Sequence, residues 1–238
     1  MVVRRMGLLG LGIALGCIVS TGAWAQAVLQ SVTVRVNSGQ MSTYLERVAA
    51  LQGTMDRVGS GGKVQVWNAT VAGTATGNTL VTVGHESLAA YAETTAKMAA
   101  DPEWQKIFAG LDDVRTLVSN SLIVSQDGGG LPAAVESGAV LQGVLVRVNP
   151  GQLATYLERV ATLKQVQKRV GSSGNLRVWQ ATLAGEASGT VAVGIVHPSL
   201  VAYAENTAKL QADAEGQKLL AGLDAIRTVV STSLFVSP

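Results

Sequence analysis

The chain contains two histidines, His85 and His197, which lie 112 residues apart. A neutral imidazole is a common general base and metal ligand near neutral pH. Each histidine falls between an expected strand and an expected helix, where it could equally be a helix cap or a boundary residue bonded to the backbone. Metal sites usually combine several His or Cys ligands, and the one cysteine, Cys17, lies near the N-terminus. We therefore predict no metal site and no cofactor, and keep both histidines as candidate ligand-binding residues.

Arginine and tryptophan recur at the same spacing, because Arg35 matches Arg147 and Trp67 matches Trp179. Side chains alternate between the two faces of a strand, which places all four on the face opposite a row of valines. One interpretation is a part-polar cavity between two sheets, holding a small, partly apolar organic ligand whose anionic group binds an arginine. The other is an ordinary sheet face, with Trp covering the rim and Arg extending to water. The cavity interpretation predicts that Arg35 is shielded from solvent.

These pairs belong to an internal duplication. Residues 32–125 match residues 144–237 without a gap, and a repeat of this length indicates two copies of one structural unit. The copies differ near the candidate residues, so we expect any pocket to be asymmetric. The differences are Gln65 against Arg177, Asn68 against Gln180, Glu86 against Pro198, and Trp104 against Gly216.

Each copy has the pattern of a ferredoxin-like unit, in the order strand, helix, strand, strand, helix, strand. Alternation over 32–37 predicts the first strand, and apolar residues every three or four positions over 41–58 predict an amphipathic helix. Asn37 or Ser38 would cap that helix, and Pro150 would lie in the first turn of its counterpart. We therefore predict an α+β chain with a signal peptide at 1–25, ferredoxin-like unit 1 at 26–126, a flexible linker at 127–142, and ferredoxin-like unit 2 at 143–238.

The first 25 residues are typical of a signal peptide. Arg4 and Arg5 precede the apolar stretch Leu8–Val19, and Ala23-Trp24-Ala25 offers a small-x-small cleavage pattern. A lipoprotein signal at Cys17 and a twin-arginine signal are the alternatives, and each matches its pattern less well. We predict a periplasmic or secreted protein.

Removing that segment changes the charge balance. Of the 18 Lys and Arg residues, Arg4 and Arg5 are lost, and the remaining 16 equal the 16 Asp and Glu residues. A neutral chain gives no electrostatic reason to bind nucleic acid or, after signal removal, a membrane surface. A small organic ligand is the partner that we expect.

The pattern resembles the dimeric α/β-barrel superfamily, near its antibiotic-biosynthesis-monooxygenase-like members. The resemblance rests on the strand–helix opening, on Val66-Trp67-Asn68-Ala69 and its counterpart at 178–181, and on His85-Glu86-Ser87-Leu88 followed by Asp101-Pro102-Glu103. It implies two four-stranded antiparallel sheets that close a barrel with helices outside. For a tandem chain it implies that both sheets come from one molecule, so we expect a monomer with an intramolecular pseudo-dimer.

Three functions fit this sequence, since the fold hosts many activities. The first is a binding module whose ligand lies between the sheets. The second, which the resemblance implies, is a cofactor-independent monooxygenase-like enzyme that consumes oxygen with an electron-rich phenol or quinol. The third is a non-catalytic scaffold. Oxygen consumption separates the enzyme from the binding module, and a saturable ligand separates both from the scaffold.

Overall fold

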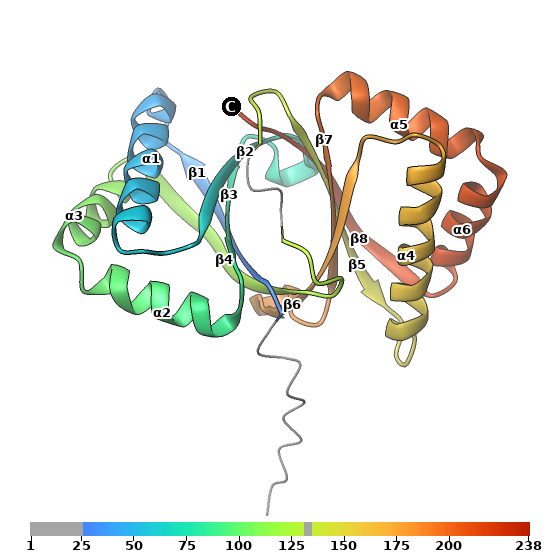
Figure 1. The fold of residues 1–238 in the computed structure, drawn as a ribbon. Coiled ribbons are helices and arrows are strands. Elements are labelled where there is room, and N and C mark those ends of the chain that lie inside the picture. Colours follow the sequence, from blue (N-terminus) through green and yellow to red (C-terminus); the bar gives the residue numbers. More distant parts are fainter. Residues whose placement is uncertain (1–25, 131–134) are drawn as a thin grey trace, which may run out of the picture.

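The computed structural model describes residues 26–130 and 135–238, so the predicted signal peptide lies outside the described residues. Two copies of one element order follow each other along the chain (Figure 1). Unit 1 contains β1 (Val28–Val36), α1 (Met41–Arg57), β2 (Lys63–Val71), β3 (Thr79–His85), α2 (Leu88–Ala99), α3 (Pro102–Leu111) and β4 (Arg115–Ser125). Unit 2 contains β5 (Val140–Val148), α4 (Leu153–Arg169), β6 (Asn175–Leu183), β7 (Val191–His197), α5 (Leu200–Ala212), α6 (Ala214–Asp224) and β8 (Arg227–Val236).

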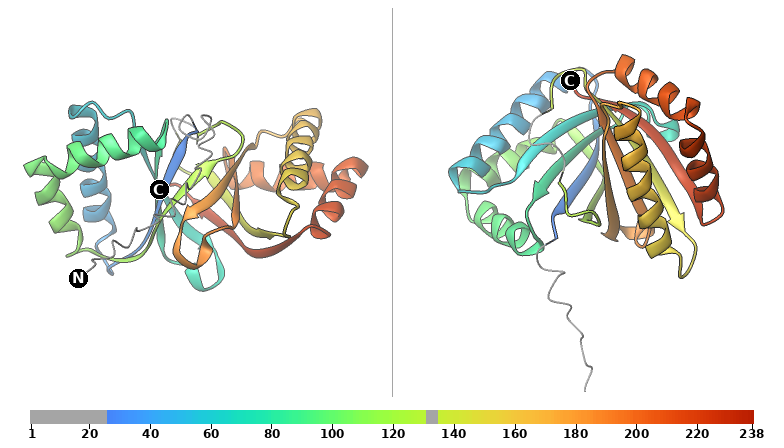
Figure 2. Two further views of the ribbon diagram at one scale, coloured as in Figure 1. Left: turned by 90° about the horizontal axis from the view of Figure 1, so that it is seen from below. Right: turned by 45° about the vertical axis from the view of Figure 1, so that its right-hand side comes forward.

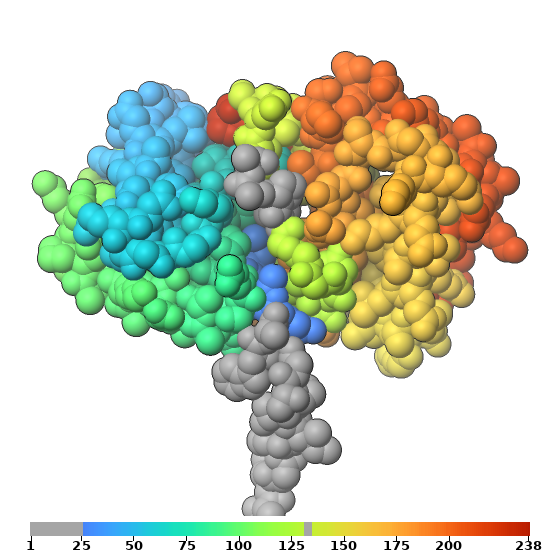
Figure 3. Space-filling model, viewed as in Figure 1, coloured from blue at the N-terminus to red at the C-terminus, as the bar shows by residue number. Residues whose placement is uncertain are grey.

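All eight strands form one closed antiparallel barrel in the order β1-β3-β2-β8-β5-β7-β6-β4. The two units close it together, because β2 pairs with β8 and β4 pairs with β6. The helices of each unit cover the outer face of that unit's strands, on opposite sides of the barrel (Figures 1 and 2). The space-filling view shows them as two lobes with the strands and linker segments between (Figure 3). The predicted pseudo-dimeric α/β barrel is therefore confirmed.

The alternation in the strands explains how this barrel is packed. In unit 1, Val34 of β1 and Val81 of β3 point outward and are buried against Tyr44 and Val48 of α1 and Leu111 of α3. Residues at the intervening positions point into the barrel. The row of valines thus packs under the helices, as the sequence predicted.

The starts of α1 and α4 differ from the prediction. The N-cap of α1 is Gln40, which makes no side-chain cap bond, so the prediction of a cap at Asn37 or Ser38 was wrong. The amide of Asn37 instead donates to the carbonyl of Asp113 at 3.0 Å. The prediction for Pro150 was also wrong, because it lies in the turn before α4.

An ion-pair cluster ties the end of α1 to the start of α3. Asp101 caps α3 and accepts from Arg57 at 2.6 Å, and Arg57 also contacts Glu103 at 2.7 Å. The hydrogen bond from Arg57 is the main reason that the pKa of Asp101 falls to about 2. Unit 2 repeats the contact, with Arg169 and Asp213 at 2.7 Å.

The connection between the units contacts the barrel on both sides of residues 131–134. Arg177 donates from Nε to the carbonyl of Gly130 at 3.1 Å, and Lys164 pairs with Asp127 at 2.7 Å. On the other side, Val135 packs against the cluster around Trp67. The strand β5 begins at 140, inside the range 127–142 expected as linker. Among the described helices, none has the length and hydropathy needed to cross a membrane.

Candidate functional site

A cavity lined mainly by apolar side chains lies in unit 1, between the outer face of the sheet and the three helices. Its volume is about 350 Å³, within the usual range for small-molecule sites. We call it the helix-side cavity. Its apolar walls come from the strands and from all three helices, and they include Val32, Val48, Leu51, Met55, Val64, Val81, Val83, Met98, Trp104, Phe108 and Leu111.

Unit 2 is filled at the matching positions. Leu176 replaces Val64 and Ile195 replaces Val83, so each position gains one methylene group. Leu176 is only 2% exposed and Ile195 is 9% exposed, and both belong to one continuous core cluster. Their counterparts in unit 1 are only half-buried because they face the cavity.

The outer wall of the helix-side cavity also differs between the units. Trp104 and Phe108 of α3 stack with ring centroids 5.6 Å apart and both line the cavity. In unit 2, Gly216 replaces Trp104, and a Cβ there would lie 2.8 Å from Cδ1 of Leu210. Leu210 therefore occupies the space that the indole holds open in unit 1, and the two halves of the molecule are asymmetric as the sequence predicted.

His85 lies at the end of β3 and forms one end of the helix-side cavity. It is 7% exposed, and its Nε2 has no hydrogen-bond partner among the described residues. The ring packs edge-on against Tyr91 with centroids 5.3 Å apart. Burial lowers the pKa of His85, because desolvation disfavours the imidazolium. The imidazole is therefore neutral at pH 7 and can accept a proton.

The matching histidine in unit 2 is held by an amide. The backbone N–H of Ser173 donates to Oδ1 of Asn206, which fixes the orientation of this amide. Its Nδ2 then donates to Nδ1 of His197 at 3.0 Å, so His197 carries its proton on Nε2. The edge-on contact is kept, with His197 and Tyr203 centroids 5.4 Å apart. His197 is thus restricted to one tautomer, and its Nε2, like that of His85, has no hydrogen-bond partner among the described residues.

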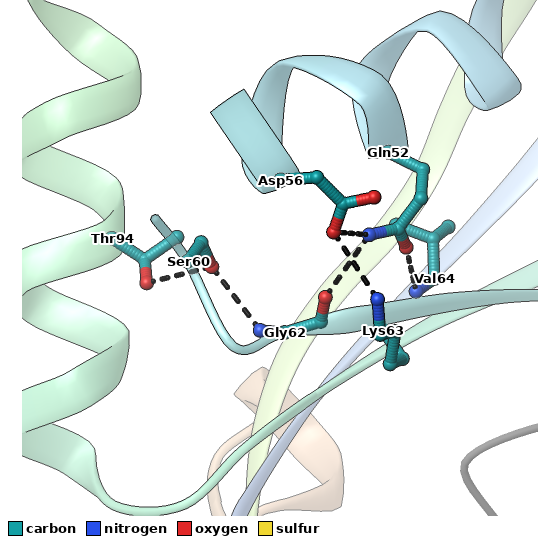
Figure 4. Close-up of polar contacts among 7 residues, drawn as sticks. All are labelled: Gln52, Asp56, Ser60, Gly62, Lys63, Val64 and Thr94. Carbon is teal, nitrogen blue, oxygen red and sulfur yellow. Dashed lines mark hydrogen bonds and ion pairs between the residues drawn. The ribbon is translucent and has the colours of Figure 1, made fainter. Parts of the chain in front are cut away.

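Unit 1 replaces this amide with a hydroxyl. Thr94 stands where unit 2 has Asn206, and its Oγ1 lies 3.1 Å from Oγ of Ser60 (Figure 4). The same turn is fixed by Gln52, which donates to Asp56 at 2.9 Å and accepts from the N–H of Val64 at 2.8 Å. His85 is consequently free of the contact that fixes the tautomer of its counterpart.

Tyr44 and Arg115 form the other end of the helix-side cavity. In the β1 ladder His85 pairs with Val28 and Arg115 pairs with Val36, so these two groups stand at opposite ends of the strand. The hydroxyl of Tyr44 lies beside the guanidinium of Arg115, and Nε of Arg115 is buried without a hydrogen-bond partner in the described part of the chain. Burial raises the pKa of Tyr44, and the nearby guanidinium opposes that shift. This end suits a hydroxyl or a negatively charged oxygen.

The remaining candidates from the sequence lie on the other side of the sheet. Trp67 and Trp179 are 0% and 3% exposed, and both belong to the barrel interior. Arg35 and Arg147, in contrast, are exposed near the ends of β1 and β5. The prediction that Arg35 is shielded was therefore wrong. Its Nε donates to Oδ1 of Asn78 at 3.4 Å. The structure does not bring the arginines and tryptophans together around one cavity.

Sequence reasoning missed most of the helix-side cavity. Tyr44 and Arg115 recur in both units, so the repeat gave no reason to choose them. The signal in the sequence is the set of differences between the copies, such as Trp104 against Gly216 and Thr94 against Asn206. The second of these differences was not among the predictions. In the described residues, no group of three or more His, Cys, Asp or Glu side chains is arranged to hold a metal ion.

Comparison with known proteins identifies the fold. A scan against family models and a search of curated protein sequences give no match. Among solved structures, a proposed monooxygenase of Fusobacterium nucleatum is similar over 90% of this chain and 94% of its own, with 12% identity and a TM-score of 0.62. A proposed monooxygenase of Lactobacillus acidophilus covers 88% and 94%, with 8% identity and a TM-score of 0.59. An anthrone oxidase-like protein covers 89% and 92%, with 14% identity and a TM-score of 0.54.

At these identities the likeness concerns the fold. The chain has the fold of the dimeric α/β-barrel superfamily, with both halves of the barrel supplied by one polypeptide. Within that class, the particular feature of this chain is a cavity under the helices of unit 1, at positions that buried side chains fill in unit 2.

Proposed function

We propose that this chain is an exported, cofactor-independent oxygenase-type enzyme that takes one small, electron-rich aromatic substrate into the helix-side cavity. The observation that carries the proposal is the position of His85, a buried neutral imidazole at the wall of an apolar cavity, whose tautomer is not fixed by an amide as that of His197 is. A general base must be unprotonated at the working pH and must lie within reach of the proton that it abstracts. Export rests on the signal-peptide pattern of residues 1–25.

The two ends of the cavity would have separate roles. A flat apolar substrate lies between the strand valines and the rings of Trp104 and Phe108. Its hydroxyl or keto oxygen lies at the Tyr44 and Arg115 end, where a guanidinium stabilises negative charge that develops on oxygen. The acidic C–H at the far side of the substrate lies at His85.

The reaction would begin with proton transfer from an activated methylene group of the substrate to Nε2 of His85. The resulting carbanion is delocalised into the aromatic system and reduces molecular oxygen directly. One oxygen atom becomes the new carbonyl group, and the other leaves as water with the two hydrogens of the methylene group. The substrate supplies all the electrons, so the step needs no further reductant. The names of the structural neighbours agree with chemistry of this class.

Oxygen uptake with a panel of anthrone-type compounds, which carry an activated methylene group, tests the proposal. Replacing a general base lowers turnover by roughly 10²–10⁴-fold, so the variant His85→Gln should lose that much activity. The matched control His197→Gln changes the same residue type in the filled unit and should keep activity within about twofold. Equal loss in both variants, or oxygen uptake that neither variant affects, would contradict the proposed role of His85.

Binding without turnover is the second candidate. It is favoured by the placement of His85 and Arg115 at opposite ends of β1, which suits a ligand anchored at both ends. Saturable binding of a panel compound in the helix-side cavity without oxygen uptake would decide for it. If neither binding nor oxygen uptake is observed, the scaffold function remains.

A further inference from the structure

The barrel interior contains a second cavity of about 260 Å³, which we call the lumen cavity. It is separated from the helix-side cavity by the sheet itself, since Ser31 and Thr33 of β1 line the lumen cavity while Val32 lines the other. Both units contribute to its walls. Its apolar and aromatic lining includes Leu29, Leu80, Leu141, Leu145, Trp179 and Phe235.

Small residues in unit 2 create this space. Gly194 stands where unit 1 has Thr82, and Ala192 stands where unit 1 has Leu80. A Cβ on Gly194 would lie 2.9 Å from Cζ3 of Trp179, so the glycine makes room for the indole beside β7. The missing side-chain volume on this wall leaves a hollow that the larger residues of unit 1 do not fill.

Hydroxyl groups supply the polarity of the lumen cavity. The side chains of Ser31 and Thr33 enter from unit 1, and those of Ser231 and Ser233 enter from unit 2. None of these four hydroxyls is hydrogen-bonded to another described residue, and each can both donate and accept. They are therefore available to a ligand that carries a hydroxyl, carbonyl or N–H group.

The walls also determine the charge of that ligand. Among the described residues that line the lumen cavity there is no Asp, Glu, Lys, Arg or His. An ion in such a place would lose its hydration without gaining a counter-charge, which costs far more than hydroxyl contacts return. A neutral aromatic molecule instead gains burial against Trp179 and Phe235 and keeps its polar group bonded.

We infer that the lumen cavity is a second binding site, distinct from the proposed catalytic cavity, for a small uncharged aromatic molecule that carries one hydrogen-bonding group. This inference does not depend on the proposed oxygenase activity. An engineered apolar cavity of about 150 Å³ accepts benzene, so the lumen cavity is large enough for phenol or indole.

Calorimetric titration of residues 26–238 with phenol, indole and benzoate tests the inference. Phenol and indole should bind at a lumen site, and benzoate, which has a similar size but a negative charge, should bind there at least tenfold more weakly. Two variants fill the lumen with residues taken from the other unit. Ala192→Leu copies Leu80, and Thr33→Leu copies Leu145. Each should weaken the binding of phenol and indole at least tenfold.

The double variant Val64→Leu, Val83→Ile fills the helix-side cavity and serves as the control, in which lumen binding should be unchanged. Melting curves confirm that each variant is folded. Two lumen variants are used, so the test still holds if one of them does not fold. The inference is overturned if no neutral probe binds the unaltered protein, if both lumen variants bind as well as it does, or if the control variant loses binding. The last result would place the probe in the helix-side cavity.

Discussion

Filling the helix-side cavity should stabilise the protein while it abolishes substrate binding. The variant Val64→Leu, Val83→Ile gives unit 1 the residues that unit 2 already has at Leu176 and Ile195. Each change adds one methylene group to a half-buried position that faces a cavity of about 350 Å³. Burial of a methylene group stabilises by about 0.8 kcal/mol, so the pair should raise the free energy of unfolding by about 1.6 kcal/mol.

Differential scanning calorimetry of residues 26–238 gives the readout. For a chain of this size, 1 kcal/mol corresponds to about 2–4 °C in Tm, so the expected rise is about 3–6 °C. Oxygen uptake should fall to background in the same variant, because the substrate loses its place beside His85.

The reverse change in unit 2 is the matched control. Leu176→Val and Ile195→Val remove methylene groups from a closed core, and each should lower stability by about 0.5–1.5 kcal/mol without reducing activity. If the filled unit 1 variant is destabilised by 1 kcal/mol or more, the added groups have met side chains instead of empty space. The account of a hollow unit 1 would then be refuted.

Three further results are expected. NMR titration should place the pKa of His85 below 6.5, and a titration midpoint at or above 6.5 would contradict its burial. Because the unfolded chain binds this proton more readily than the folded chain, the free energy of unfolding should fall as the pH drops from 6.5 toward the folded-state pKa. Gly194→Ala should destabilise the protein by about 1–3 kcal/mol, because its Cβ meets Trp179, whereas Gly84→Ala, with no atom within 4 Å, should be tolerated. Residues 26–130 alone leave β2 and β4 without β8 and β6, so light scattering should show a dimer for this half and a monomer for the full chain; a stable monomeric half would contradict the pairing.

The fold could be predicted because its signals are local and occur twice. Alternation assigned the valines of β1 and β3 to the helix-covered face. A period of two shows on which face of the sheet a side chain lies. It does not show how far along the barrel axis the residue lies. The pairing of β1 with β3 ends at Val34, so Arg35 lies one residue beyond that ladder and is exposed.

The site was harder to predict because it depends on empty volume. Alternation gives both units the same apolar face, and only the packing of whole side chains shows that Val64 and Val83 leave space where Leu176 and Ile195 do not. The role of Asn206 likewise depends on a contact with His197, nine residues away in sequence and across a strand–helix junction. The sequence placed the ligand between the sheets, whereas the titratable groups gather on the helix side.

A crystal structure of the protein soaked anaerobically with the compound that gives the fastest oxygen uptake tests the central claim most directly. The account predicts one substrate molecule in the helix-side cavity, with its reactive carbon beside Nε2 of His85, its oxygen at Tyr44 and Arg115, and no substrate in the matching region of unit 2. A structure in which the side chains of unit 1 fill that cavity, or in which the substrate binds beside His197 instead, would contradict it.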